Sequence, residues 1–391
     1  MVGSNYDTWL ETPRIWFETN GYSASFTGAR PDGSNGFAPQ TGLNEFGLAF
    51  VTLATATPEN GSVAPGKKQI ASRTLYLKDI LHTCKTVDDV KLYVDQYDHS
   101  VLSEDVFLYV DKSGKYIVVE PYTILEGNDS KYVLANFCPS TITDFSSIRQ
   151  MRYVNGTAFL KNKIDTSLAF CTALSDTMHV CRTKHGDGTL LTSIQDLDNG
   201  INYLYFYHDY KHPVKFVLAD ELKKGNHFME IPPLFPPNEE FKELTGFKTP
   251  MNSSSIDRFL IFCAGLFFIS AIFFLINYFR KRKTTKYSGV KLLLAFLSLL
   301  TLFYIFMLAR VENIFYFPAP YSDGSLSVVS VASYIPFLIL ILLVPLFILN
   351  RKVLKEKAWT SFPKWIFTLN NATYLILVVL FSYWGLYNIF S

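Results

Sequence analysis

The chain has 391 residues, of which 36 are basic and 34 acidic, so its formal net charge is only +2. This balance gives no electrostatic basis for a nucleic-acid partner, and we expect none. The five cysteines include no CxxC pair and no histidine spacing suited to a tetrahedral site, so we expect no metal and no other cofactor. Cys171 and Cys181 could pair in an oxidising compartment or remain free thiols, and their spacing does not decide between the two.

The first predicted elements are strands. Two apolar-rich runs flank Asn20-Gly21, the dipeptide most typical of a two-residue turn, so residues 14–27 are predicted to form a β-hairpin. Residues 46–55 follow a turn that contains glycine and are predicted to form a buried strand. Apolar residues then recur at helical spacing over residues 72–97, which predicts two helical halves.

Strands and helices alternate again further along the chain. The patterns predict strands over 106–110, 116–120, 132–136, 189–197, 201–208 and 214–218, and helices over 146–162 and 165–174. Strands before and after a helical middle are typical of an α+β domain with two or four layers. Residues 231–250 are polar and rich in proline, which predicts a linker.

The composition changes near residue 255, where four apolar runs begin that are long enough to cross a hydrocarbon core of about 30 Å as helices. They are predicted at about 259–279, 292–309, 328–349 and 366–388. The loops after the first and third runs are rich in Lys and Arg, whereas the loop between the second and third contains only Arg310. Because such residues stay on the cytoplasmic side, we expect a multi-pass protein of the cell membrane whose first 255 residues and both termini are extracytoplasmic. The lipid bilayer is then one partner.

Common catalytic motifs are missing from the sequence: it contains no GxSxG elbow, no HExxH and no phosphate loop. His82 and Cys84 are two residues apart and would point to different faces of a helix, so Cys84 is interpreted as a core residue. No charged residue lies near the centre of a predicted membrane helix, which favours an anchor over a transporter or channel.

Several short sequences carry a family resemblance by their order and intervals. They are Gly3-Ser4-Asn5-Tyr6-Asp7, Gly42-Leu43-Asn44-Glu45-Phe46-Gly47-Leu48, Asp111-Lys112-Ser113-Gly114-Lys115 with Val118-Val119-Glu120, Ala135-Asn136, and Arg149-Gln150-Met151-Arg152. In turn these resemble the G-R-N-x-D, G-[MVI]-N-E-x-G-L, D-x-[ST]-G-x with V-[VI]-E, T-N and R-F-L-R motifs of the N-terminal-nucleophile (Ntn) linear amide hydrolases. This family includes choloylglycine hydrolase, penicillin V acylase and the acyl-CoA:6-aminopenicillanic acid acyltransferase group.

The resemblance implies an αββα sandwich over residues 1–235, joined by a linker over 236–255 to a membrane domain over 256–391. It also implies hydrolysis or acyl transfer at a linear amide C–N bond of a small-molecule N-acyl substrate. The nucleophile would be an N-terminal cysteine whose own α-amino group, with a pKa of about 8, accepts the thiol proton.

The family match also assigns roles to residues of this chain. Asp7 would orient the α-amino group, and Arg149 would polarise the site through charge-assisted hydrogen bonds. Asn136 and a backbone N–H near Ala54 would bind the oxyanion. Asn44 belongs to the matching turn, where it would act as a turn former.

Two features depart from the family. The nucleophile would lie about 12 residues before Met1, and Ser4 stands where the family has arginine. The chain also opens without an export signal, although its first part is expected outside the cell. We therefore expect this sequence to be an N-terminally incomplete fragment. The alternatives are a catalytically inactive homologue that acts as a tethered binding or sensing module, and a transporter with an appended domain.

Overall fold

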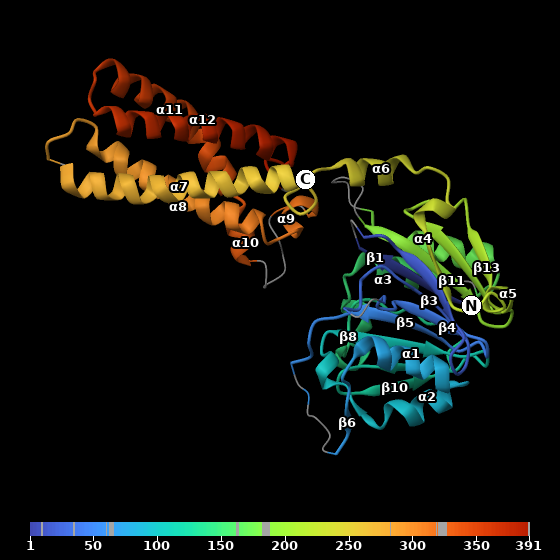
Figure 1. Ribbon diagram of the computed structural model, residues 1–391. Helices are drawn as coiled ribbons and strands as arrows, with labels where there is room; N and C mark the ends of the chain where they lie inside the picture. The colour runs from blue at the N-terminus through green and yellow to red at the C-terminus, as the bar shows by residue number, and fades with distance from the viewer. Residues whose placement is uncertain are drawn as a thin grey trace. The chain divides into compact units, whose positions relative to one another are not determined.

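The computed structural model describes residues 1–8, 11–33, 36–59, 61, 66–161, 164–181, 188–281, 283–317, 319 and 327–389. It divides into two compact units, Met1–Leu244 and Thr245–Ser391, and each is described here by itself (Figure 1). The first unit contains all the described β-strands, and the second consists of helices.

The first unit is built on two antiparallel sheets. The larger sheet has the strand order β10 (Ile124–Gly127), β9 (Tyr116–Val119), β8 (Asp105–Val110), β5 (Ala49–Ala54), β4 (Thr41–Asn44), β3 (Ala24–Gly28), β2 (Arg14–Glu18) and β14 (His227–Glu230). The smaller sheet has the order β1 (Val2–Asp7), β11 (Thr189–Asp196), β12 (Ile201–Phe206) and β13 (Val214–Val217). A short parallel pair, β6 (Lys68–Gln69) and β7 (Tyr97–Asp98), lies apart from both sheets.

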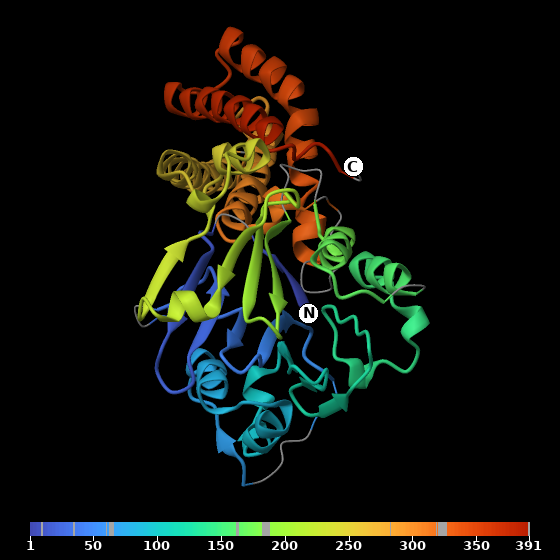
Figure 2. The ribbon, with the colours of Figure 1, turned by 90° about the vertical axis from the view of Figure 1, so that its right-hand side faces the viewer.

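Helices α1 (Arg73–Thr83) and α2 (Val87–Val94) cover one face of the larger sheet, as Figures 1 and 2 show. Leu77, Ile80 and Leu81 recur at helical spacing on α1 and are fully buried in one core with the strand residues Phe26 and Phe50. Burial of such side chains is worth about 1.5–3 kcal/mol each, so this packing holds the helices on the sheet.

The other face of the larger sheet meets the smaller sheet. Asn202 Nδ2 on β12 donates to Ser25 Oγ on β3 over 2.8 Å, and both residues are buried. On the opposite face of β12, the Tyr205 and Thr172 hydroxyls are 2.6 Å apart, and Thr172 lies on α4 (Leu168–Met178). Side chains alternate between the faces of a strand, so these contacts give the layer order helix, sheet, sheet, helix.

Three further α-helices lie wholly or mainly among the described residues of the first unit. They are α3 (Met151–Leu160), which packs beside α4, α5 (Leu218–Leu222) and α6 (Glu239–Gly246). The predicted α+β class is confirmed, as are the hairpin around Asn20-Gly21 and the pair of helices over 72–97. Cys84 is a core residue, as expected. Helix α6 lies inside the segment predicted as a linker.

The strand predicted over 132–136 is wrong. These residues have no strand pairing, and the free edge of β9 is instead paired by β10, with Ile124 opposite Val119. A tight turn after β9 leads directly into β10, so β9 is paired with β8 on one edge and with β10 on the other. No edge of β9 is left to pair with a later segment. The apolar pattern of residues 132–136 reflects partial burial of a loop. The apolar patterns also missed β10 and β14, whereas β1 was expected only through the family motif over residues 3–7, which corresponds to the end of a strand.

The second unit contains four helices that are long and apolar enough to cross a membrane, judged by length and composition alone, among the residues described. Its helices are α7 (Ser254–Lys281), α8 (Ser288–Leu308), α9 (Asn313–Tyr316), α10 (Ser327–Ala332), α11 (Ile335–Lys355) and α12 (Ser361–Tyr383). The third candidate span, Val328–Lys355, covers α10 from Val328 onwards and the whole of α11. Asn370 on α12 is fully buried and accepts a hydrogen bond from Ser270 Oγ on α7 over 2.9 Å.

Candidate functional site

Asp7 lies at the end of β1, where the pairing with β11 shifts register between Tyr6 and Asp7. This irregularity turns the carboxylate away from the regular ladder. Its Oδ1 accepts a hydrogen bond from Thr189 Oγ1 over 2.7 Å, and its Oδ2 accepts one from Arg152 Nη1 over 2.6 Å. The Asp7 side chain is only 16% exposed, so the arginine compensates a largely buried charge.

Arg152 connects Asp7 to Asn136. The same Nη1 group donates to Asn136 Oδ1 over 3.0 Å, and Asn136 Nδ2 donates to the backbone O of Ala54 over 2.8 Å. A guanidinium can only donate and a carbonyl can only accept, so these two contacts fix which end of the amide faces which partner. One N–H of the amide is used by Ala54, and the second N–H can donate to an anion.

A buried carboxylate holds the loop that carries Asn136. Glu120, at the end of β9, is 2% exposed and accepts hydrogen bonds from the backbone N and the hydroxyl of Ser140. Gln150 Nε2 donates to the backbone O of Asn136 over 3.1 Å. Contacts on both sides therefore keep the loop in place, although it has no strand pairing.

The structure brings Asp7, Asn136 and Ala54 together but does not bring Arg149 to them. Arg149 is exposed, and its Nη1 donates to the backbone O of Ser146 over 2.7 Å. The residue that contacts Asp7 and Asn136 is Arg152, to which the family motif assigned no role. The signal was present, because the matching motif has an arginine at each end, but spacing could not show which one faces Asp7.

Asn44 is fully buried in the turn between β4 and β5. Its Oδ1 accepts from the backbone N–H groups of Phe46 and Leu48, and its Nδ2 donates to the backbone O of Leu81 and Cys84. All these partners are backbone groups of the turn and of the end of α1. This geometry is that of a turn residue that also satisfies carbonyls at a helix C-terminus.

Cys138 is the cysteine closest in sequence to Asn136, and it is buried at 3% exposure. Burial raises the pKa of its thiol above the ordinary value, although a contact with Thr55 Oγ1 opposes the shift. The thiolate is the nucleophilic form of cysteine, so a thiol that stays protonated at neutral pH is a poor nucleophile. His82 makes no dyad with Cys84, since its ring nitrogens contact Tyr22 O and Glu18.

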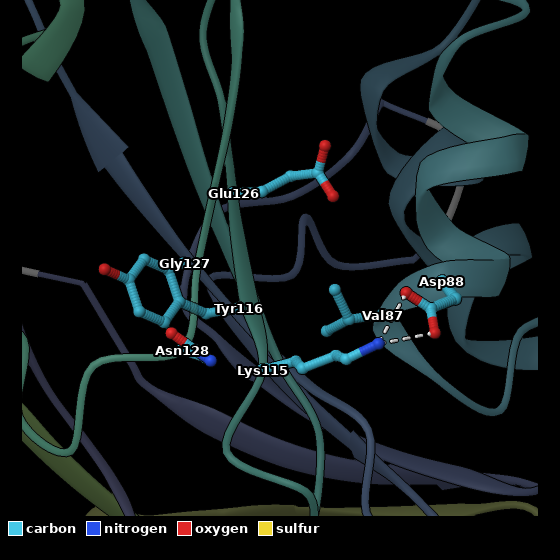
Figure 3. Close-up of a pocket in the computed structure, with 7 residues that line it drawn as sticks. All are labelled: Val87, Asp88, Lys115, Tyr116, Glu126, Gly127 and Asn128. Atoms are coloured by element: carbon cyan, nitrogen blue, oxygen red, sulfur yellow. Dashed lines mark hydrogen bonds and ion pairs between the residues drawn. The ribbon is translucent and has the colours of Figure 1, made fainter.

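A shallow pocket lies beside the start of α2, and none of the candidate site residues Asp7, Asn136 and Arg152 lines it (Figure 3). It is lined by Val87, Asp88, Lys115, Tyr116, Glu126, Gly127 and Asn128. Lys115 Nζ lies 2.9 Å from Asp88 Oδ2, and both side chains are more than half exposed. An exposed ion pair of this kind adds little to stability, and we assign no function to the pocket.

The chain is similar in fold to several solved structures. A variant of conjugated bile acid hydrolase from Clostridium perfringens has 16% identity and a TM-score of 0.45, covering 59% of this chain and 92% of its own. Another variant of that hydrolase has 16% identity and a TM-score of 0.43, with coverages of 61% and 93%. Penicillin V acylase from Agrobacterium tumefaciens has 12% identity and a TM-score of 0.42, with coverages of 55% and 80%.

No protein-family model and no curated protein matches the sequence.

Thr189→Val should destabilise the first unit, because the Thr189 hydroxyl accepts from Val180 N over 2.9 Å and donates to Asp7 Oδ1. Valine has the same shape but leaves both partners unsatisfied, at an expected cost of about 1–3 kcal/mol. Denaturant unfolding of the purified chain measures the change. Thr83→Val is the control, since Thr83 is exposed and its hydroxyl donates to Asp79 O one turn back, with only a long contact of 3.8 Å to Cys84 Sγ besides. Equal stability of the two variants would contradict the bridging role.

Proposed function

We propose that the complete protein is a membrane-anchored hydrolase or acyltransferase that acts on a linear amide C–N bond of a small-molecule N-acyl substrate. The domain that does so is the first unit, a sandwich of the Ntn-hydrolase type. The main support is the Arg152 contact that joins Asp7 to Asn136, because it places a base-orienting carboxylate and an amide donor close together.

In this proposal the nucleophile is an N-terminal cysteine supplied from upstream of Met1. Its thiol attacks the amide carbonyl while its own α-amino group takes the thiol proton. Asp7 holds the resulting ammonium, and the free N–H of Asn136 donates to the oxyanion. The ammonium then returns the proton to the leaving amine as the C–N bond breaks, and water or an acceptor amine releases the acyl group from the thioester.

The edge of β1 supports this arrangement. Among the described strands, β1 pairs only with β11, so its other edge can accept a further strand. A strand paired antiparallel to that edge would run from a start beside Asp7 towards a turn before Met1. About 12 preceding residues would suffice for such a strand and its turn.

We further propose that α7, α8, the α10–α11 segment and α12 cross the cell membrane and hold the first unit on the extracytoplasmic side. The support is the apolar length of these helices and the basic residues that follow the first and third of them. Because the domain would lie near lipid, a long-chain N-acyl amide is the favoured substrate class.

The mature N-terminus of the natural protein tests the nucleophile. We expect Edman sequencing of the chain extracted from its native membrane to give cysteine as the first residue, about 12 residues before Met1. That residue would complete both nucleophile and base. A mature protein that begins at Met1 would overturn the hydrolase mechanism and favour a tethered binding or sensing module.

Asn136→Ala and Arg152→Gln in the complete protein should each lower kcat by about 10² or more, because the first removes an oxyanion donor and the second releases the amide that Arg152 orients. Release of amine from an N-acyl amino acid measures the rate. Arg149→Gln is the matched control, since Arg149 contacts neither partner, and it should stay within about threefold of the parent. If Arg149→Gln loses activity and Arg152→Gln does not, the assignment taken from the structure is wrong.

Membrane orientation can be read by labelling intact cells with an impermeant maleimide. In a Cys181→Ser background, Asn199→Cys in the exposed turn between β11 and β12 should react, because the first unit is outside. Thr284→Cys, in the basic loop after α7, should react only once the membrane is opened. The reverse labelling pattern would reject the proposed topology.

A further inference from the structure

We propose that Cys181, His208 and Glu240 form a binding site for a divalent transition-metal ion of the Zn²⁺ class. The three residues come from distant parts of the chain, yet one ligand atom of each lies within 4.8 Å of the others. In a tetrahedral Zn²⁺ site, donor atoms are about 3.3–3.8 Å apart, given bond lengths of about 2.0–2.3 Å. The site therefore needs only a small closure. The other ring nitrogen of the histidine, Nδ1, makes a hydrogen bond of 3.2 Å with Glu240 Oε2, which orients the ring.

The histidine provides a second, independent observation. Its side chain is only 8% exposed, and its Nε2 is buried without a hydrogen-bond partner in the described part of the chain. Buried polar atoms are nearly always paired, so an unpaired imidazole nitrogen beside a thiol and a carboxylate indicates a missing partner. A metal ion satisfies that requirement, because imidazole, thiolate and carboxylate are all zinc ligands.

The backbone holds His208 in an unusual conformation. Tyr207 and His208 have positive φ angles of 48° and 63°, a region that residues other than glycine rarely adopt. Asn238 keeps this turn against α6: its Nδ2 donates to Tyr207 O over 2.8 Å, and its Oδ1 accepts from Phe241 N over 3.0 Å. The strained turn and the first turn of α6, which carries Glu240, are thus held together. Such strain is commonly found at ligand sites.

Cys181 is placed by pairing with the start of β11. It forms an isolated bridge with Gly188, and the adjacent Thr189 N donates to Val180 O over 2.7 Å. Thr189 is also the residue whose hydroxyl contacts Asp7. A metal ion on Cys181 would therefore fix the segment that supports the Asp7 carboxylate. Metal binding itself does not depend on the proposed amide hydrolysis.

Metal binding releases one proton and leaves one coordination position of the metal ion without a protein ligand. The Cys181 thiol loses its proton to solvent as the sulfur–metal bond forms, while His208 binds as neutral imidazole. Three protein ligands leave a fourth position for water or another ligand. No sequence motif marks this site, because its three residues are far apart in the chain.

Cobalt spectroscopy tests the site in the full chain, purified in detergent with a tag that contains no histidine, stripped with chelator and kept reduced. We expect one Co²⁺ per chain, a thiolate-to-cobalt charge-transfer band, and its loss when Zn²⁺ is added. Cys181→Ser should abolish the band, and His208→Asn and Glu240→Gln should weaken Zn²⁺ binding at least tenfold. Asparagine is chosen for His208 because it tolerates a positive φ.

Cys171→Ser and Glu239→Gln are the matched controls. Cys171 is another cysteine, on α4, and Glu239 is the exposed neighbour of Glu240 on α6. Neither belongs to the cluster. Both variants should bind cobalt as the parent does. The proposal is overturned if the parent gives no charge-transfer band, or if Cys181→Ser keeps it while circular dichroism shows both proteins folded.

Discussion

The arrangement of the first unit around its candidate site depends on one guanidinium. Arg152 lies at the start of α3 and contacts the end of β1 through Asp7 and the loop after β10 through Asn136. Asp7 is largely buried, and a carboxylate in that position is stable only with a charged or strongly donating partner. The ion pair therefore does two things at once: it compensates a buried charge and fixes the direction of an amide. Thr189 and Glu120 act on either side of it, one on the carboxylate and the other on the loop.

Periodicity predicted those elements whose signal is local. The dipeptide Asn20-Gly21 marks a hairpin by its own backbone preference, and the apolar residues of α1 recur on one face. The strand prediction over 132–136 was wrong because apolar character does not distinguish a strand from a partly buried loop. The apolar patterns marked neither β1 nor β14, whose pairing partners β11 and β2 are distant in sequence, although the family motif over residues 3–7 corresponds to the end of a strand.

The candidate site shows the same limit. Asp7 and Asn136 could be named because each stands in a short motif, but their contact is made through a third residue on another element. The motif offers Arg149 and Arg152 equally, and only the start of α3 at Met151 directs one of them inward. The cluster of Cys181, His208 and Glu240 has no motif, so only the folded chain brings it into view.

The hydrogen bonds of Asn44 couple the unfolding of α1 to the unfolding of the β4–β5 hairpin. Its four hydrogen bonds join the turn of the β4–β5 hairpin to the last carbonyls of α1, and no other side chain offers two donors and two acceptors in the same volume. Helix α1 therefore cannot separate from the larger sheet without breaking hydrogen bonds of the Asn44 side-chain amide. The amide hydrogen-exchange rates of α1 and of the β4–β5 hairpin should therefore change together, because the two segments open as one cooperative unit.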